Sequence, residues 1–350
     1  MTNQIADSGV AAALNKDEKD LPFYLKKNVG FGVARQEDDL LHPQLNAKVS
    51  DDTLTETQYF GFDIPEENIK ALGYIWHHPN LHMVSGGVWV FQGTKRNQLA
   101  CEMFDIRTFM HDRVLDKDLH DYRLANGYGD KIIEPLKKHH VTYSDPDRKN
   151  SWDVHYDAVN EPVMFGNGKH FDQPMRAKGE LVLRGKRYDI DCFTLRDRSF
   201  GSPRQETLNH LPPTTWTHGI FGPDFSFACT VFDAAELMPE WKGQFAVPED
   251  RRIMGGWVIK DGEKRLMTHC AKRTVRNPVT LHPTRIEMDV TDDRQCTYHL
   301  VGTVKASCEW MYLTNMRNIL AATTWECDGR IAYGEAQDGQ FPDFIHAFMP

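Results

Sequence analysis

Hydrophobic and polar residues alternate over many short stretches of the chain, which is the pattern of half-buried β-strands. Within residues 225–232, two phenylalanines, a cysteine and a valine fall on every second position. Residues 257–259 and 264–267 flank Asp261-Gly262, a dipeptide that favours a two-residue hairpin turn. Long amphipathic helices are few. The sequence therefore predicts an all-β protein built from sandwiches or antiparallel barrels.

A glycine-rich strand pattern occurs twice along the chain. Residues 85–93 (SGGVWVFQG) resemble residues 254–262 (MGGWVIKDG), about half the chain away. The similarity is either the trace of a duplication or a chance similarity between strands that join two glycines to an aromatic residue. A duplication predicts two similar β domains that meet near residues 160–175, which we place at 21–168 and 169–350. Residues 1–20 are predicted to form a loose tail.

Composition narrows the class of protein. The chain has 350 residues, 40% of them hydrophobic, with 19 Phe, 11 Tyr and 8 Trp, which is typical of a folded protein and not of a disordered one. A net charge of −9 without a basic cluster argues against nucleic-acid binding. No stretch approaches the roughly 20 apolar residues that span a bilayer, and the N-terminal residues are polar. We therefore expect a soluble, cytoplasmic protein without a membrane span.

Several cofactor and metal motifs are absent. Residues 30–35 (GFGVAR) lack the last glycine of the dinucleotide fingerprint, and no P-loop, HExxH or GxSxG is present. The seven cysteines show no zinc spacing, so we expect reduced core residues rather than disulfides. The adjacent pairs His77-His78 and His139-His140 point to opposite faces of a strand, so neither pair alone chelates a metal. We expect no cofactor and no metal, although ligands from distant strands leave no trace in the sequence.

Residues 195–201 carry the first candidate chemistry, at the end of a predicted hairpin. On a strand, Arg196 and Arg198 point to one face and Asp197 to the other. Asp197 is the candidate acid, because an aromatic-lined cavity raises a carboxyl pKa by desolvation, whereas nearby arginines lower it. The alternative is an Arg–Asp–Arg ion pair that closes the strand end.

Residues 214–224 carry the second candidate chemistry. His218 is the candidate base, since an imidazole exchanges protons near neutral pH; the alternative is a structural loop histidine. Trp216 and Phe221 are candidate walls for an apolar substrate, or ordinary core residues. Because short connections keep successive elements close, we expect Asp197 and His218 to line the same cavity.

Several of these segments resemble a known family. Three segments are similar to lipocalin-like two-domain proteins related to AttH and carotenoid hydratases. They are residues 170–185, residues 188–192 and the run Asp197-Arg198-Ser199-Phe200-Gly201. Those proteins carry an Asp-[His/Arg]-x-[Trp/Phe]-Gly motif in their second barrel. Kievitone hydratase and lipocalin-like Diels–Alderases belong to the same broad group. Trp89 after its two glycines and residues 332–336 (AYGEA) also fit, so the resemblance spans roughly residues 70–340.

The resemblance implies two tandem lipocalin-like antiparallel β-barrel domains with few helices. It also implies acid–base chemistry without an organic cofactor on isoprenoid or polyketide skeletons. By the same resemblance Glu335 points into the barrel; the alternative is a solvent-facing strand residue. His78, at a predicted strand end, either faces the domain interface or packs in a loop before Pro79. The candidate catalytic residues are Asp197, His218 and Glu335, and the candidate substrate-binding residues are Trp216, Phe221, Arg196, Arg198, Trp89 and His78.

Two functions follow from these residues. The first is a lyase or isomerase, either a hydratase or dehydratase or an enzyme that shifts a double bond, acting on a terpenoid, steroid or related hydrophobic skeleton. The second is a non-catalytic binding protein for the same hydrophobic small molecules. A protein–protein scaffold gains no support from the sequence, and the oligomeric state is left open.

Overall fold

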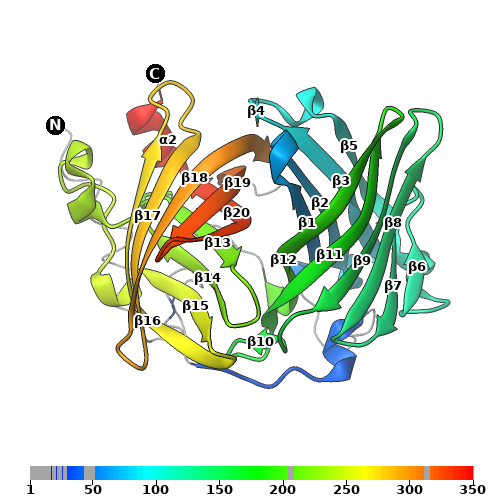
Figure 1. Ribbon diagram of the computed structural model, residues 1–350, viewed down its shortest axis with the longest axis horizontal. Helices are drawn as coiled ribbons and strands as arrows, with labels where there is room; N and C mark the ends of the chain where they lie inside the picture. Colours follow the sequence, from blue (N-terminus) through cyan, green and yellow to red (C-terminus); the bar gives the residue numbers. More distant parts are fainter. Residues whose placement is uncertain are drawn as a thin grey trace. The chain divides into compact units, whose positions relative to one another are not determined.

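Strands dominate the part of the chain that the structure describes (Figure 1). This computed structural model describes residues 30–42, 52–203, 209–310 and 316–349, together with Asp17, Leu21 and Lys26. Within those ranges the strands β1 to β20 are joined by turns and short 3₁₀ helices, and the one α-helix, α2 (Pro342–Phe348), follows the last strand. The predicted all-β fold is confirmed. Among the described residues, no helix is long and apolar enough to cross a membrane.

The chain divides into two compact units, one formed by residues 31–205 and the other by residues 206–350 together with residues 1–30. We call Phe31–Gln205 the open-sheet unit and the part from Glu206 onward the closed-barrel unit. The predicted domain boundary, between 168 and 169, falls inside the open-sheet unit instead. The reason is strand pairing, because the two strands that follow residue 169 pair with strands from the first half of the chain.

The open-sheet unit is one antiparallel sheet. Its strands lie in the order β5-β3-β2-β1-β12-β11-β9-β8-β7-β6, and β10 pairs with β11. Their bounds are β1 (Leu54–Ile64), β2 (Ile69–His78), β3 (Met83–Gln92), β5 (Met103–His111), β6 (Asp121–Arg123), β7 (Gly129–Glu134), β8 (Lys138–Asp145), β9 (Asn150–Ala158), β10 (Val163–Met164), β11 (His170–Leu183) and β12 (Lys186–Pro203). The short β4 (Thr94–Lys95) follows β3 along the chain. Alternate residues of β9, such as Trp152 and Val154, are buried in its apolar core.

The closed-barrel unit is an eight-stranded antiparallel barrel. The order is β17-β16-β15-β14-β13-β20-β19-β18, and pairing of β17 with β18 closes it. The bounds are β13 (Thr214–Ile220), β14 (Phe225–Phe232), β15 (Ile253–Lys260), β16 (Glu263–Arg276), β17 (Pro283–Asp292), β18 (Thr297–Trp310), β19 (Arg317–Cys327) and β20 (Arg330–Gln340). The two units share one strand order. The order β5-β3-β2-β1-β12 in the open sheet corresponds to the order β16-β15-β14-β13-β20 in the barrel.

Local predictions for the barrel agree with the structure. The apolar positions of β14 lie in the barrel core, where Phe227 meets Trp325 edge-on at 5.1 Å between ring centroids. Asp261 and Gly262 both have positive φ, as a hairpin turn between β15 and β16 requires. All seven cysteines are free, and five of them are buried, as expected for reduced core residues.

Gly334 allows β13 and β20 to approach closely. A Cβ atom at this position would lie 2.0 Å from the backbone oxygen of His218. We expect Gly334→Ala to lower the free energy of unfolding by roughly 1–3 kcal/mol, because the strands must move apart. Urea unfolding monitored by tryptophan fluorescence measures the effect, with Tyr333→Ala as the neighbouring control. Equal losses in the two variants would show that this close approach does not matter.

Candidate active site

His218 and Glu335 lie side by side on one face of the closed barrel. Ala336 belongs to the apolar core of the barrel, so Glu335 and Gln337 point to the opposite, outer face of β20. The expectation that Glu335 points into the barrel is therefore wrong, because the alternation of the strand places Ala336 there instead. His218 of β13 is directly opposite Glu335 in the ladder, and both side chains are fully buried. Since directly opposed residues have Cβ atoms about 5 Å apart, the imidazole and the carboxylate are neighbours.

The surroundings of this pair supply an aromatic wall and a fixed orientation. The Trp216 ring meets the His218 ring nearly edge-on, at 5.2 Å between centroids and 69° between planes. Gln337 donates a hydrogen bond from Nε2 to Oε1 of Glu335 at 2.7 Å. The face therefore combines a buried imidazole, a buried carboxyl group and an apolar surface.

Phe221 lies at the turn that follows β13. Its ring stands 4.9 Å from that of Phe225, and it packs against the barrel core. The guanidinium of Arg330 lies 5.8 Å from the Phe221 ring and forms an ion pair with Asp224 at 2.7 Å. The contacts of Phe221 therefore join it to the core and to the turn.

The Arg-Asp-Arg motif of β12 places its charges on opposite faces of the sheet, as predicted. Arg196 lies opposite the core residue Phe60, whereas Asp197 lies opposite Tyr59. Arg196 and Arg198 are fully buried, and Asp197 is half-buried. The arginines face the interior of the open-sheet unit, away from Asp197.

Arg196 belongs to a buried ionic network. Its Nη1 donates to Asp39 Oδ1 at 2.6 Å and its Nε donates to Gln173 at 2.9 Å. His139 lies between Asp39 and Asp130, with its ring nitrogens 3.3 Å and 3.1 Å from their oxygens. Burial by itself would raise the pKa of Asp39, but Arg196 and His139 outweigh it and hold that pKa well below its usual range.

Arg198 belongs to a second buried network. It donates to the backbone oxygens of Thr57, at 3.0 Å, and of Leu40, and its guanidinium lies 3.9 Å from Glu56. Glu56 is also bonded to His42 at 2.5 Å and to His77 at 3.3 Å. Burial tends to raise the pKa of Glu56, yet the Arg198 charge and the two histidines lower it.

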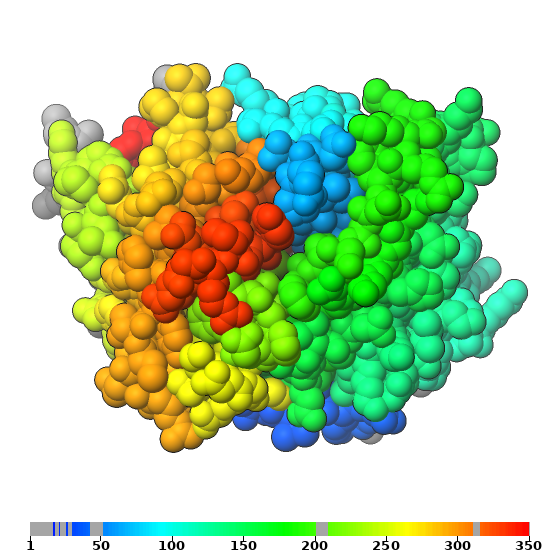
Figure 2. Space-filling view, viewed as in Figure 1, coloured from blue at the N-terminus to red at the C-terminus, as the bar shows by residue number. Residues whose placement is uncertain are grey.

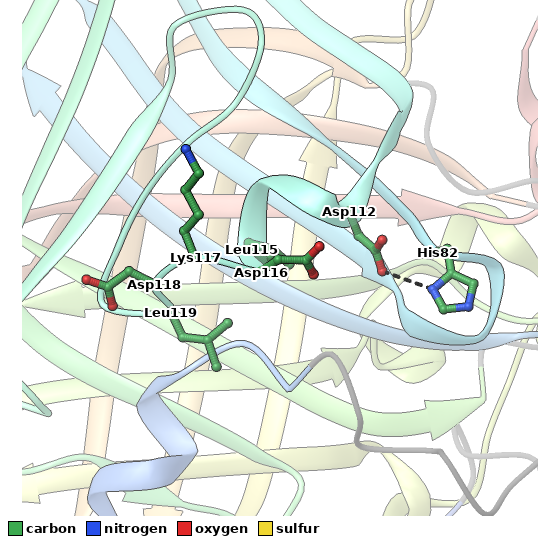
Figure 3. Close-up of a pocket in the computed structure, with 7 residues that line it drawn as sticks. All are labelled: His82, Asp112, Leu115, Asp116, Lys117, Asp118 and Leu119. Atoms are coloured by element: carbon green, nitrogen blue, oxygen red, sulfur yellow. Dashed lines mark ion pairs between the residues drawn. The ribbon is translucent and has the colours of Figure 1, made fainter.

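A cavity of about 360 Å³ lies beside this second network (Figure 3). It is lined by His82, Asp112, Leu115, Asp116, Lys117, Asp118 and Leu119. Asp112 connects it to the interior, since its carboxylate lies 3.5 Å from His77 and 3.6 Å from His82. Carboxylates and a lysine dominate the lining, so this cavity differs from the apolar one expected for a hydrophobic ligand.

The remaining predicted residues, Trp89, His78 and Asp197, lie in the open-sheet unit. Trp89 is fully buried on β3 and donates from its indole nitrogen to the sulfur of Cys101 at 2.9 Å. His78 is half-buried at the end of β2, with Nδ1 3.3 Å from the hydroxyl of Thr55. Asp197 belongs to the open-sheet unit and His218 to the closed-barrel unit. That the two line one cavity therefore stays a prediction.

The sequence analysis missed the buried acids of these networks, among them Asp39, Glu56 and Asp112. Asp39 comes from a 3₁₀ helix (Gln36–Asp39), Glu56 from β1 and Asp112 from the turn after β5. None of them stands in a motif, and their partners are distant in the chain. The histidine pairs were the available signal, because His77 and His139 are the members that reach the buried carboxylates.

The fold is that of a two-domain lipocalin-like protein, as the resemblance implied. The family described as a domain of unknown function, DUF7064, matches residues 35–337, and the chain belongs to this family. Kievitone hydratase from Nectria haematococca is similar over 90% of this chain and 97% of its own, with a TM-score of 0.52 and 11% identity. An AttH-like protein from Nitrosomonas europaea covers 89% of this chain and 99% of its own, with a TM-score of 0.47 and 11% identity. No curated protein matches the sequence.

The lowered pKa of Asp39 predicts a pH dependence of stability. A carboxyl whose pKa is lower in the folded state stabilises the protein above its unfolded pKa of about 4, and this contribution is lost as the pH falls. We expect Asp39→Asn to cost about 3–5 kcal/mol at pH 7, because Arg196 stays buried without its anion. The difference from the parent protein should narrow below pH ~4.

Urea unfolding at a series of pH values measures this difference. The control is Glu37→Gln, in the same 3₁₀ helix but largely exposed. A loss in Asp39→Asn that is independent of pH would contradict the ionic explanation.

Proposed function

We propose that this chain is a cofactor-independent lyase or isomerase that acts by acid–base chemistry on a hydrophobic small molecule, of the terpenoid or steroid class. It would add or remove water, or shift a double bond. The observation that supports this most directly is the fully buried pair of His218 and Glu335 beside Trp216.

The chemistry assigned to the pair is proton transfer. For the removal of water, protonated His218 donates a proton to the departing hydroxyl, and the C–O bond breaks with its electrons on that oxygen. The neutral imidazole of His218 then takes a proton from the adjacent carbon, and the C–H electrons form the double bond, which restores the imidazolium for the next cycle. Glu335, oriented by Gln337, stabilises the imidazolium in each cycle. Addition of water follows the same steps in reverse.

The aromatic neighbour and the burial suit an apolar substrate. Trp216 provides a flat apolar contact and helps to exclude water from the reacting carbon atoms. The name of the similar structure, kievitone hydratase, supports this class of reaction by analogy of fold alone. Asp197 remains the proposed second acid, and the experiment below includes it.

We expect His218→Gln and Glu335→Gln to lower turnover by about 10²-fold or more, the usual contribution of general acid–base catalysis. The purified protein is incubated with a library of hydroxylated and unsaturated terpenoids and steroids in H₂¹⁸O. Mass spectrometry then detects the gain or loss of water, or isotope exchange. Asp197→Asn is measured in parallel.

The matched control is His299→Gln, an exposed histidine of β18. Ligand binding, followed by tryptophan fluorescence, should persist in the His218 and Glu335 variants. Ligands that bind to the parent protein without any turnover would favour the non-catalytic binding protein. Full turnover in both variants would refute this assignment of the catalytic pair.

A further inference from the structure

Two histidines face each other across neighbouring strands of the open-sheet unit. His140 of β8 is directly opposite His155 of β9. The neighbour of His140, His139, points inward to Asp130, so His140 points to the outer face of the sheet. Asp153 precedes His155 by two residues on β9 and shares its face. In Figure 2 the teal-green atoms of β8 and β9 lie at the surface of this unit.

The three side chains are already gathered around one point. The two imidazole rings are nearly parallel, with 4.2 Å between centroids and 6° between planes. Nε2 of His140 lies 2.7 Å from a carboxylate oxygen of Asp153. One ligand atom from each of the three residues lies within 4.8 Å of the others.

The lysines next to these two histidines are paired with acids, so a cation can approach the histidines. Lys131 of β7 is opposite His140, and Lys178 of β11 is opposite His155. The two ammonium groups pair with acids, Lys131 with Asp121 at 3.0 Å and Lys178 with Asp191 at 4.0 Å. Glu180 of β11, opposite Asp153, adds a second carboxylate to the same region and forms an ion pair with Arg187.

We propose that His140, Asp153 and His155 bind a divalent transition-metal ion of the zinc class. Two imidazole nitrogens and one carboxylate oxygen suit Zn²⁺ and its neighbours better than Mg²⁺ or Ca²⁺, which prefer oxygen ligands alone. Zn²⁺ holds such ligands at about 2.0–2.2 Å. The exposed His155 and Asp153 reach this distance by side-chain rotation.

The bound ion would link β8 to β9. Three protein ligands leave a fourth position for water or another small donor. The site shares no residue with the proposed catalytic pair, so the failure of one proposal would not affect the other. It departs from the expectation of no metal, which already noted that ligands from distant strands leave no trace in the sequence.

Titration of the tag-free, EDTA-treated full chain with Zn²⁺ and Co²⁺ tests the proposal. Calorimetry should show one bound ion per chain, and Co²⁺ should give the d–d absorption of a low-coordinate site. We expect His140→Ala and His155→Ala each to weaken binding on the order of tenfold or more, and Zn²⁺ to raise the unfolding midpoint of the parent protein only.

The matched control is His299→Ala. His299 and Asp289 form a similar cross-strand pair in the closed-barrel unit, with 2.8 Å between their polar atoms. This variant should bind as the parent protein does, and so should Cys296→Ser, which removes an exposed thiol. Circular dichroism confirms that each variant is folded.

Should a variant fail to fold, electron paramagnetic resonance of the parent protein with one equivalent of Cu²⁺ decides instead, since two histidines give hyperfine coupling to two nitrogens. The proposal is overturned if the His140→Ala/His155→Ala double variant binds Zn²⁺ as tightly as the parent protein. Cu²⁺ spectra without coupled nitrogens would overturn it as well.

Discussion

The buried ion pair between Arg196 and Asp39 is the interaction on which the interior of the open-sheet unit depends. A guanidinium without access to water costs several kcal/mol unless it is paired and hydrogen-bonded. Here Asp39 and Gln173 satisfy it, and His139 joins the same carboxylate. A 3₁₀ helix and three strands, β8, β11 and β12, are thereby fixed relative to one another.

The closed-barrel unit also pairs its buried charges with one another, through other residues. Asp233 pairs with Lys272 at 2.6 Å and with Arg276 at 2.7 Å, and Arg276 also pairs with Asp338 at 2.7 Å. These side chains are buried among the strands of the barrel. Each unit therefore combines an apolar core with a buried ionic cluster. Such clusters specify strand register more sharply than apolar contacts do. If one strand shifted by one residue, each charged side chain would lose its partner of opposite charge.

The sequence predicted those features that depend on local pattern. The alternation in β14, the turn at Asp261-Gly262 and the opposite faces of Arg196 and Asp197 follow from a period of two and from turn chemistry. The predicted repeat of residues 85–93 and 254–262 also gains support, since each segment lies in the third strand of the corresponding meander of its own unit.

Features that depend on distant contacts could not be predicted from local pattern. The domain boundary was misplaced because β11 and β12 pair with strands far earlier in the chain. Arg196 and Arg198 were interpreted as substrate-binding residues or as an ion pair with Asp197, so their buried partners Asp39 and Glu56 were not anticipated. The grouping of His140 with His155 depends on the β8–β9 register, which no motif records. His218, Trp216 and Glu335 were named as separate candidates, and that they share one face became visible only from strand pairing.

The pairing of β1 with β12 and of β13 with β20 has a consequence for biosynthesis. In each unit the first long strand pairs with the last, so neither sheet can be completed until its final strand has left the ribosome. Until then the apolar face and free edge of the first strand remain available to other chains. Such non-local pairing slows folding and prolongs the interval in which aggregation competes. Efficient production of this protein should therefore depend on chaperones that shield nascent strands.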